Sequence, residues 1–161
     1  MNLVVFDPGL TTGYAIFVPG EKAMRLQEAG HLHSFNAVAR FMDCLSNNYA
    51  GSKWTVLYEG FARGNSVVNE QLQTIETCGA IKAIAALKGW DVVMQYPPSR
   101  KGYIPVAKVM IREHFQGNDK LYHHAFDAVA HGLFYMHQEG IEWQRQFWLH
   151  RTFRKTVDTY L

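Results

Sequence analysis

The sequence predicts an α/β fold built on a mixed five-stranded sheet that is flanked by helices. Short turns separate the first three strand-like segments, so these strands are expected to pair in an antiparallel arrangement. Each later strand-like segment follows a helical segment, and such crossovers favour parallel pairing. A chain of 161 residues is long enough to bury one hydrophobic core, so a single domain is the simplest organisation.

The first three strands are predicted from apolar runs that glycine and proline interrupt. Asn2–Phe6 is apolar after its first residue, as in a central strand buried on both faces. Gly13–Val18 is the second run and Arg25–His33 the third, and Pro19 and Gly20 mark the turn between them. These segments make the antiparallel part of the predicted sheet.

A helix and a fourth strand follow. Ser34 is a suitable helix cap, because its hydroxyl accepts a hydrogen bond from a free amide of the first turn. The apolar residues that follow recur at helical spacing: Phe35, Val38, Met42, Leu45 and Tyr49. Trp54–Tyr58 is then a strand of the buried type, and Glu59 ends it.

The second half of the domain alternates helix and strand. A long helix is predicted over 67–88, with Gly89 ending it. Asp91–Tyr96 is the fifth strand, closed by a Pro-Pro pair. Two further helices are predicted, over Pro105–Phe115 and over His123–His137. We therefore expect one domain over 1–140 and an aromatic, basic tail over 141–161 that packs on it.

Composition narrows the class of protein. No apolar stretch is long enough to span a bilayer, and the first residues lack the pattern of a secretory signal. The two cysteines, Cys44 and Cys78, are expected to be reduced thiols in the core. These features predict a cytoplasmic protein without a membrane partner. The net charge of +2 is weak evidence for a nucleic-acid partner, although the basic residues gather in the C-terminal half.

Two acids stand at the ends of predicted strands. If the first and fourth strands are parallel neighbours, Asp7 and Glu59 lie at the same sheet edge, about 4.7–4.9 Å apart in strand spacing. Two carboxylates so close repel each other unless a proton or a cation lies between them. For Asp7 alone, a turn residue that bonds the amides of Gly9 and Leu10 is the better interpretation. The pair favours a cation site.

The last predicted helix carries a polar face. At helical spacing, His124, Asp127 and His131 fall on one narrow face. The opposite stripe is apolar and faces the core: Ala125, Val129, Gly132, Leu133 and Met136. For an isolated helix, a solvated face is the better interpretation. Here the strand-ending acids already define a sheet edge that the helix can cross. This favours metal ligands over a solvated face for the polar residues of the helix.

Oxygen-rich sites select hard cations, so Mg²⁺ or Mn²⁺ is expected rather than zinc. Two such ions about 3.5–4 Å apart stabilise the attacking and leaving oxygens of a phosphodiester displacement. The predicted chemistry is therefore metal-dependent hydrolysis of a nucleic-acid backbone.

Three motifs resemble those of the RuvC-type Holliday-junction resolvases, members of the ribonuclease H-like superfamily. They are DPGLTTGYA near the N-terminus, LYEGF at the second acid, and HAFDAVAHGL in the last helix, and the resemblance covers Met1–His137. It implies that Asp7, Glu59 and Asp127 are metal ligands, and that His124 is a ligand or orients the attacking water. It also implies two Mg²⁺ or Mn²⁺ ions and cleavage of branched DNA.

The same resemblance implies a homodimer that pairs through the helix over 67–88 and nicks a four-way junction symmetrically. The first turn has one residue fewer than many bacterial members, which is typical of phage relatives. We therefore expect the protein in the cytoplasm of a bacterial cell or a phage-infected host. The residues expected to contact DNA are Phe61, Arg63, Asn65, Ser66, Arg100, Lys101 and Lys108.

Other functions fit parts of the pattern. The same site residues serve a ribonuclease acting on RNA–DNA hybrids, although the HxxD helix makes this less favoured. A DNA-binding protein that retains the fold without cleavage is a second alternative. Glycine-rich turns after an aspartate also cradle phosphates in actin-like kinases, but those proteins need two such domains and this chain is too short for both.

Overall fold

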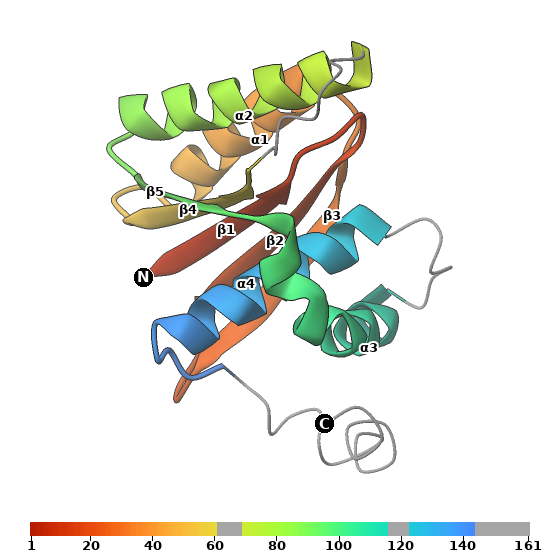
Figure 1. The fold of residues 1–161 in the computed structure, drawn as a ribbon. Coiled ribbons are helices and arrows are strands. Elements are labelled where there is room, and N and C mark those ends of the chain that lie inside the picture. The colour runs from red at the N-terminus through yellow and green to blue at the C-terminus, as the bar shows by residue number, and fades with distance from the viewer. Residues whose placement is uncertain (61–68, 116–122, 144–161) are drawn as a thin grey trace.

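The computed structural model describes residues 1–60, 69–115 and 123–143. It contains a five-stranded sheet with the order β3-β2-β1-β4-β5 (Figure 1). The strands are β1 Asn2–Asp7, β2 Thr12–Pro19, β3 Met24–Leu32, β4 Trp54–Glu59 and β5 Asp91–Gln95. β1 and β2, and β2 and β3, pair antiparallel, whereas β1–β4 and β4–β5 are parallel. The predicted mixed sheet is confirmed.

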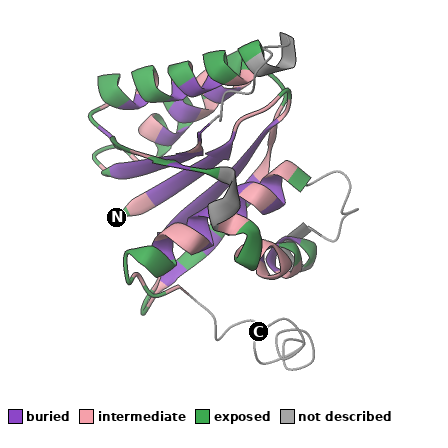
Figure 2. Cartoon of the chain, viewed as in Figure 1, coloured by how far each residue is buried: buried purple, intermediate pink, exposed green. Residues whose placement is uncertain are grey.

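Helices cover both faces of the sheet (Figure 1). α1 Phe35–Asn48 and α2 Asn69–Leu87 lie on one face, and α3 Ile104–Phe115 and α4 His123–Gln138 on the other. The β1 side chains alternate between the two layers: Leu3 and Val5 pack with α4, and Val4 and Phe6 with α1 and α2. The central strands β1, β2 and β4 are accordingly the most buried part of the sheet (Figure 2), which explains the unbroken apolar run at the N-terminus.

The helix ends follow the predicted signals. The Ser34 hydroxyl accepts a hydrogen bond from the Ala37 amide at 3.1 Å and caps α1. Gly89 follows α2 with a φ of 65°, a left-handed conformation that favours glycine. One prediction is wrong: Cys44 is exposed, because α1 turns Val38, Met42 and Leu45 to the core and Cys44 away from it. Cys78 is buried, as expected.

The main addition to the predicted fold is a 3-10 helix, η1 Pro97–Tyr103, between β5 and α3. Two prolines open it, and their fixed φ suits the first turn of a helix. η1 packs against α4, so the chain leaving β5 turns back over the same face of the sheet. This turn brings Arg100 to the carboxyl ends of β1 and β4.

After α4 the chain returns to the outer edge of β3. Gly140 reverses it with a φ of 64°, and the Met24 amide then donates to the Glu142 carbonyl at 2.8 Å. Trp143 forms a parallel bridge to Met24 and packs on the α4 side of the core. Residues 144–161, most of the predicted tail, lie outside the described residues, so their packing stays a prediction. In the described part of the chain, no helix has the length and apolar character needed to cross a membrane.

Candidate active site

The sheet register places the two strand-ending acids side by side. Phe6 pairs with Tyr58 in the parallel β1–β4 ladder, so the next residue of each strand, Asp7 and Glu59, reaches the same edge. Asp7 also pairs with Gly13 on β2. This is the edge that the alternation of helix and strand predicted.

α4 crosses this edge in very close contact with the sheet. A β-carbon added to Gly13 would lie 2.1 Å from the His124 carbonyl oxygen, and one added to Gly132 would lie 2.3 Å from the Phe17 ring. Glycine at both positions therefore lets the helix approach the strands. The approach positions His124, Asp127 and His131 over the ends of β1 and β4.

His124 is bonded to the first acid. Its Nδ1 lies 2.8 Å from Asp7 Oδ2. Burial raises the pKa of Asp7 above its ordinary value, and the charges of Glu59 and Asp127 raise it further, whereas the hydrogen bond from His124 opposes the shift. The same hydrogen bond raises the pKa of His124. The site thus favours an added positive charge near Asp7.

His131 is bonded to the second acid. Its Nε2 lies 2.6 Å from Glu59 Oε2, and its Nδ1 lies 2.8 Å from Gln95 Oε1. The histidine is fully buried, and Gln95 on β5 pairs with Glu59 in the sheet. The polar face of α4 is therefore not a solvated surface; it contacts both strand acids.

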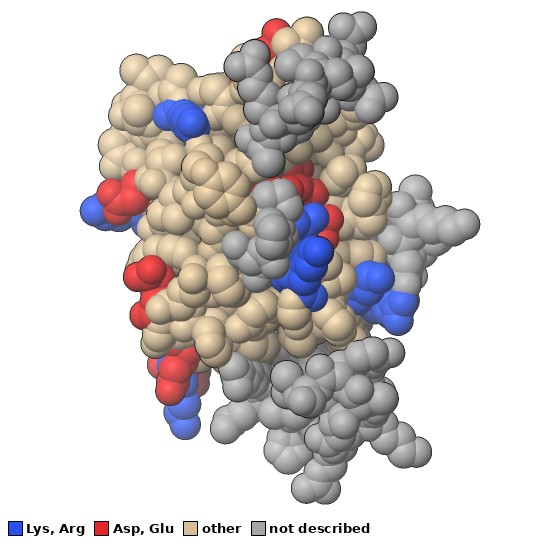
Figure 3. All heavy atoms as spheres, in the orientation of Figure 1, with Lys and Arg blue, Asp and Glu red and all other residues tan. Residues whose placement is uncertain are grey.

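Arg100 joins the second and third acids. Its Nη1 lies 2.9 Å from Glu59 Oε2. Its Nε lies 3.0 Å from Asp127 Oδ1, and its Nη2 lies 3.0 Å from Asp127 Oδ2. Nη2 donates a hydrogen bond to Asp127, and Nε adds an ion-pair contact with the other oxygen of the same carboxylate. The Arg100 side chain is only 16% exposed. In the space-filling view, acidic and basic atoms adjoin near the middle of the visible face (Figure 3).

The donors gathered at this edge are suited to a hard cation. Three carboxylates and one imidazole meet where α4 crosses the sheet, and oxygen donors of this kind are those that Mg²⁺ and Mn²⁺ prefer. In this conformation, the described residues offer no group of three or more His, Cys, Asp or Glu side chains set to hold one ion. Arg100 supplies the positive charge beside Glu59 and Asp127.

The predicted site residues divide into three groups. Asp7, Glu59, His124 and Asp127 come together at one edge, and whether they bind metal stays a prediction. Of the predicted DNA contacts, Arg100 faces the carboxylates, while Lys101 and Lys108 are exposed on η1 and α3. The remaining ones lie outside the described residues: Phe61, Arg63, Asn65 and Ser66.

The sequence predicts His131 on the polar face of α4, but it does not identify the partners of this residue. Gln95 is not predicted to take part in the site. Gln95 is the polar end of an otherwise mostly apolar strand, at the position paired with Glu59. That pairing is the signal that points to it, because a polar side chain on a buried face needs a hydrogen-bond partner.

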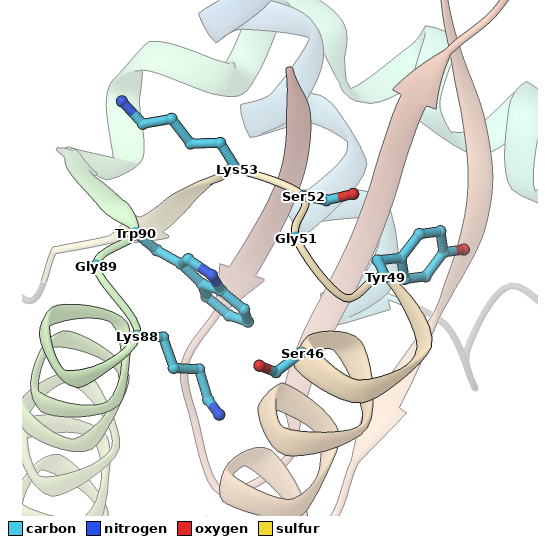
Figure 4. Close-up of a pocket in the computed structure, with 8 residues that line it drawn as sticks. All are labelled: Ser46, Tyr49, Gly51, Ser52, Lys53, Lys88, Gly89 and Trp90. Carbon is cyan, nitrogen blue, oxygen red and sulfur yellow. The ribbon is translucent and has the colours of Figure 1, made fainter.

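A separate cavity of about 330 Å³ lies at the opposite edge of the sheet, where β4 and β5 begin (Figure 4). Trp90 and Lys88 extend between the ends of α1 and α2, whereas Lys53 points away. Both lysines already form ion pairs, Lys88 with Asp43 and Lys53 with Asp91. Among the described residues that line it, the cavity therefore offers no unpaired cation, and the acidic edge is the better candidate.

Comparison with known proteins identifies the fold. No protein-family model and no curated protein matches the chain. Solved structures do: Thermus thermophilus RuvC in complex with Holliday junction substrate is 15% identical, with a TM-score of 0.60, over 88% of this chain and 98% of that one. The fold is that of the RuvC resolvases. It is ribonuclease H-like, as the sequence predicted.

Two further resolvases share this fold. The fowlpox virus Holliday junction resolvase is 18% identical, with a TM-score of 0.59, over 86% of this chain and 99% of that one. The yeast mitochondrial resolvase Ydc2 is 10% identical, with a TM-score of 0.54, over 86% of this chain and 78% of that one. The RuvC-like fold thus accounts for most of this chain and nearly all of the bacterial and viral proteins.

Proposed function

We propose that this protein is a divalent-metal-dependent endonuclease that cleaves branched DNA, with the four-way junction as its preferred substrate. The convergence of Asp7, Glu59 and Asp127 at one edge of a RuvC-like fold supports this proposal. The T. thermophilus and fowlpox proteins of the same fold were both solved with Holliday junction DNA. We place the activity in the cytoplasm of a bacterial cell or a phage-infected host.

In the proposed reaction, one group of residues binds the cations and another binds the DNA. Asp7, Glu59 and Asp127, with His124, would hold the cations; such ions activate water and stabilise the leaving 3′-oxygen. His124 keeps Asp7 oriented through its 2.8 Å hydrogen bond. The exposed Lys101 and Lys108 would contact phosphates of the backbone, as would Arg63, Asn65 and Ser66 from the segment after β4. Phe61 of the same segment would contact the DNA through its aromatic ring.

The direct experiment incubates the purified protein with labelled four-way junction, flap, RNA–DNA hybrid and linear duplex, each with Mg²⁺, Mn²⁺ or a chelator. We expect cleavage of the branched DNA only when a divalent ion is present. Cleavage of the hybrid alone would replace the proposal with a ribonuclease. Junction binding without any cleavage would indicate a binding protein of this fold.

Arg100 competes with a cation for Asp127, because its guanidinium charge already lies against both carboxylate oxygens. We therefore expect Arg100→Gln to destabilise the metal-free protein by about 1.5–3 kcal/mol, since it leaves partly buried carboxylates unpaired. We also expect the variant to bind Mn²⁺ more tightly than the wild type. Urea unfolding with and without Mg²⁺, and calorimetric Mn²⁺ titration, measure the two effects.

Lys101→Gln is the matched control, since it removes an exposed positive charge from the next position of the same 3-10 helix. It should leave both the metal-free stability and the Mn²⁺ affinity near those of the wild type. Equal effects of the two substitutions would show that Arg100 acts only through general charge.

The homodimer is proposed to pair through α2. Leu72 and Ile75 on this helix are 48% and 43% exposed, so α2 presents apolar side chains to solvent on its outer side (Figure 1). We expect Ile75→Glu to convert a dimer to a monomer, because a charge at a close interface is costly to bury. Light scattering coupled to size exclusion measures the mass.

Arg40→Glu is the control, because it places the same charge at an exposed position on α1, and this variant should remain dimeric. A monomeric wild type would contradict the proposal.

A further inference from the structure

His131 is a buried polar residue whose role the proposed reaction does not explain. It lies on α4 one helical turn beyond Asp127 and is 0% exposed, so it reaches neither DNA nor solvent. Apolar core residues surround its position on the helix: Ala128, Val129, Ala130 and Leu133. Burial of an imidazole in such surroundings is costly unless its nitrogens are hydrogen-bonded.

Both ring nitrogens of His131 have partners, and one partner belongs to the acidic edge. Nε2 lies 2.6 Å from Glu59 Oε2, a short distance typical of a hydrogen bond to a charged oxygen. Nδ1 lies 2.8 Å from Gln95 Oε1. The main chain of Gln95 is itself fixed. It pairs with Glu59 in the β4–β5 ladder, and its main-chain carbonyl accepts a hydrogen bond from the Gly60 amide at 2.7 Å.

The contact with Glu59 places a hydrogen on one ring nitrogen of His131. Nε2 must carry a hydrogen, because the Glu59 carboxylate can only accept. With a neutral ring, Nδ1 then accepts, so the Gln95 amide is turned to donate from its Nε2. That nitrogen otherwise has no hydrogen-bond partner among the described residues, and the amide orientation is an assignment that this network decides.

Among the described residues, two donors meet at one carboxylate oxygen of Glu59. His131 Nε2 and Arg100 Nη1 both lie within 3 Å of Oε2, at 2.6 and 2.9 Å. Arg100 is partly exposed, so it can withdraw from the acids when a cation competes for them, as proposed above. His131 is fully enclosed and cannot withdraw in the same way. It is therefore the donor that remains on Glu59 in the cation-bound state.

We propose that His131 is a positioning residue for Glu59: its Nε2–H holds Oε2, Gln95 fixes the ring, and Oε1 is left for a divalent cation. The inference rests on the proposed function. A neighbouring hydrogen-bond donor that orients a ligand in this way commonly sets metal affinity. α4 thus orients both strand acids, Asp7 through His124 and Glu59 through His131, with Asp127 between them.

Two substitutions at His131 separate positioning from packing. The amide nitrogen of glutamine can take the place of Nε2 and donate, and the amide oxygen of asparagine can take the place of Nδ1 and accept. His131→Gln can therefore still donate to Glu59, whereas His131→Asn keeps only the contact with Gln95. Both are smaller than histidine, asparagine by one methylene more than glutamine, so their melting temperatures are needed to report how much packing each has lost.

The measurements are Mn²⁺ affinity by calorimetry without DNA, the Mn²⁺ concentration that gives half-maximal cleavage, and junction affinity in a chelator. We expect His131→Asn to weaken Mn²⁺ binding about 10- to 100-fold and to raise the half-maximal concentration in parallel, with His131→Gln much closer to the wild type. Junction affinity should stay unchanged in both, because His131 is buried.

A folded His131→Asn that binds Mn²⁺ as the wild type does would overturn the inference while the nuclease proposal stood. If both variants lost Mn²⁺ affinity in proportion to their fall in melting temperature, His131 would act only as a packing residue. A wild type that neither binds Mn²⁺ nor cleaves branched DNA would overturn both proposals. If neither variant folds, Gln95→Met provides the test, because it removes the side-chain contact that fixes the His131 ring. An unchanged Mn²⁺ affinity in Gln95→Met would then overturn the inference.

Discussion

Asp7→Asn is expected to abolish cleavage of a four-way junction while junction binding stays within a few-fold of the wild type. Asp7 ends the central strand and has the most buried carboxylate of the acidic edge, with a side chain 8% exposed. An amide is a poorer ligand for a hard cation than a carboxylate, and metal-ion stabilisation of a phosphodiester transition state amounts to several kcal/mol. The rate should therefore fall by about a thousand-fold or more.

The loss of activity should not come from unfolding. The asparagine has the same shape, and its carbonyl oxygen can still accept from His124. Burial raises the pKa of Asp7 above 3.8 in the folded protein, so the protonated carboxyl group stabilises the fold at low pH. This contribution to stability is lost as the pH rises through the pKa of the folded state. Asparagine does not ionise, so at neutral pH the metal-free variant should melt no lower than the wild type. Calorimetric melting and junction cleavage measure the two properties.

Asp91→Asn is the matched control for this prediction. Asp91 is 59% exposed at the start of β5, where it pairs with Lys53 far from the acidic edge. Its substitution should leave cleavage unchanged, since an exposed ion pair contributes little. Undiminished cleavage by a protein carrying both Asp7→Asn and Asp127→Asn would show that the acidic edge is not the active site.

The acids could be predicted from the sequence because their placement follows from regular geometry. Asp7 and Glu59 end two apolar strands, and the parallel register of β1 and β4 then brings them together. Likewise, helical spacing alone puts His124, Asp127 and His131 on one face. Both inferences depend only on periodicity and chain direction, which the sequence expresses directly.

The partners of these residues could not be predicted in the same way. Arg100 reaches Glu59 and Asp127 because η1 folds back over α4, and the stretch PPSRKGY has no apolar period that indicates a 3-10 helix. Exposed basic residues and buried ion-paired ones look alike in a sequence, so Arg100 was grouped with the DNA contacts. The His131–Gln95 contact joins residues 36 positions apart, and only the packed structure brings them together.

Gly13→Ala is expected to destabilise the fold by about 3 kcal/mol and to abolish cleavage. Its β-carbon would lie 2.1 Å from the His124 carbonyl oxygen, 2.2 Å from the carbonyl carbon and 2.8 Å from the Ala125 amide. All three are backbone atoms, so no side-chain rotation relieves the overlap, and overpacking of this kind costs about 1–3 kcal/mol or more. α4 must move away, which separates His124 and Asp127 from Asp7.

Urea unfolding and junction cleavage together test this coupling between one glycine and the whole site. Gly79→Ala is the control for stability, because a β-carbon there meets nothing within 4 Å and alanine favours the helix by up to about 1 kcal/mol. Gly79→Ala should be as stable as the wild type or more so. If Gly13→Ala unfolded at the wild-type urea concentration and still cleaved, α4 would not need its close contact with β2. Asp7 and Asp127 would then meet by some other arrangement, because the described packing leaves no room for that β-carbon.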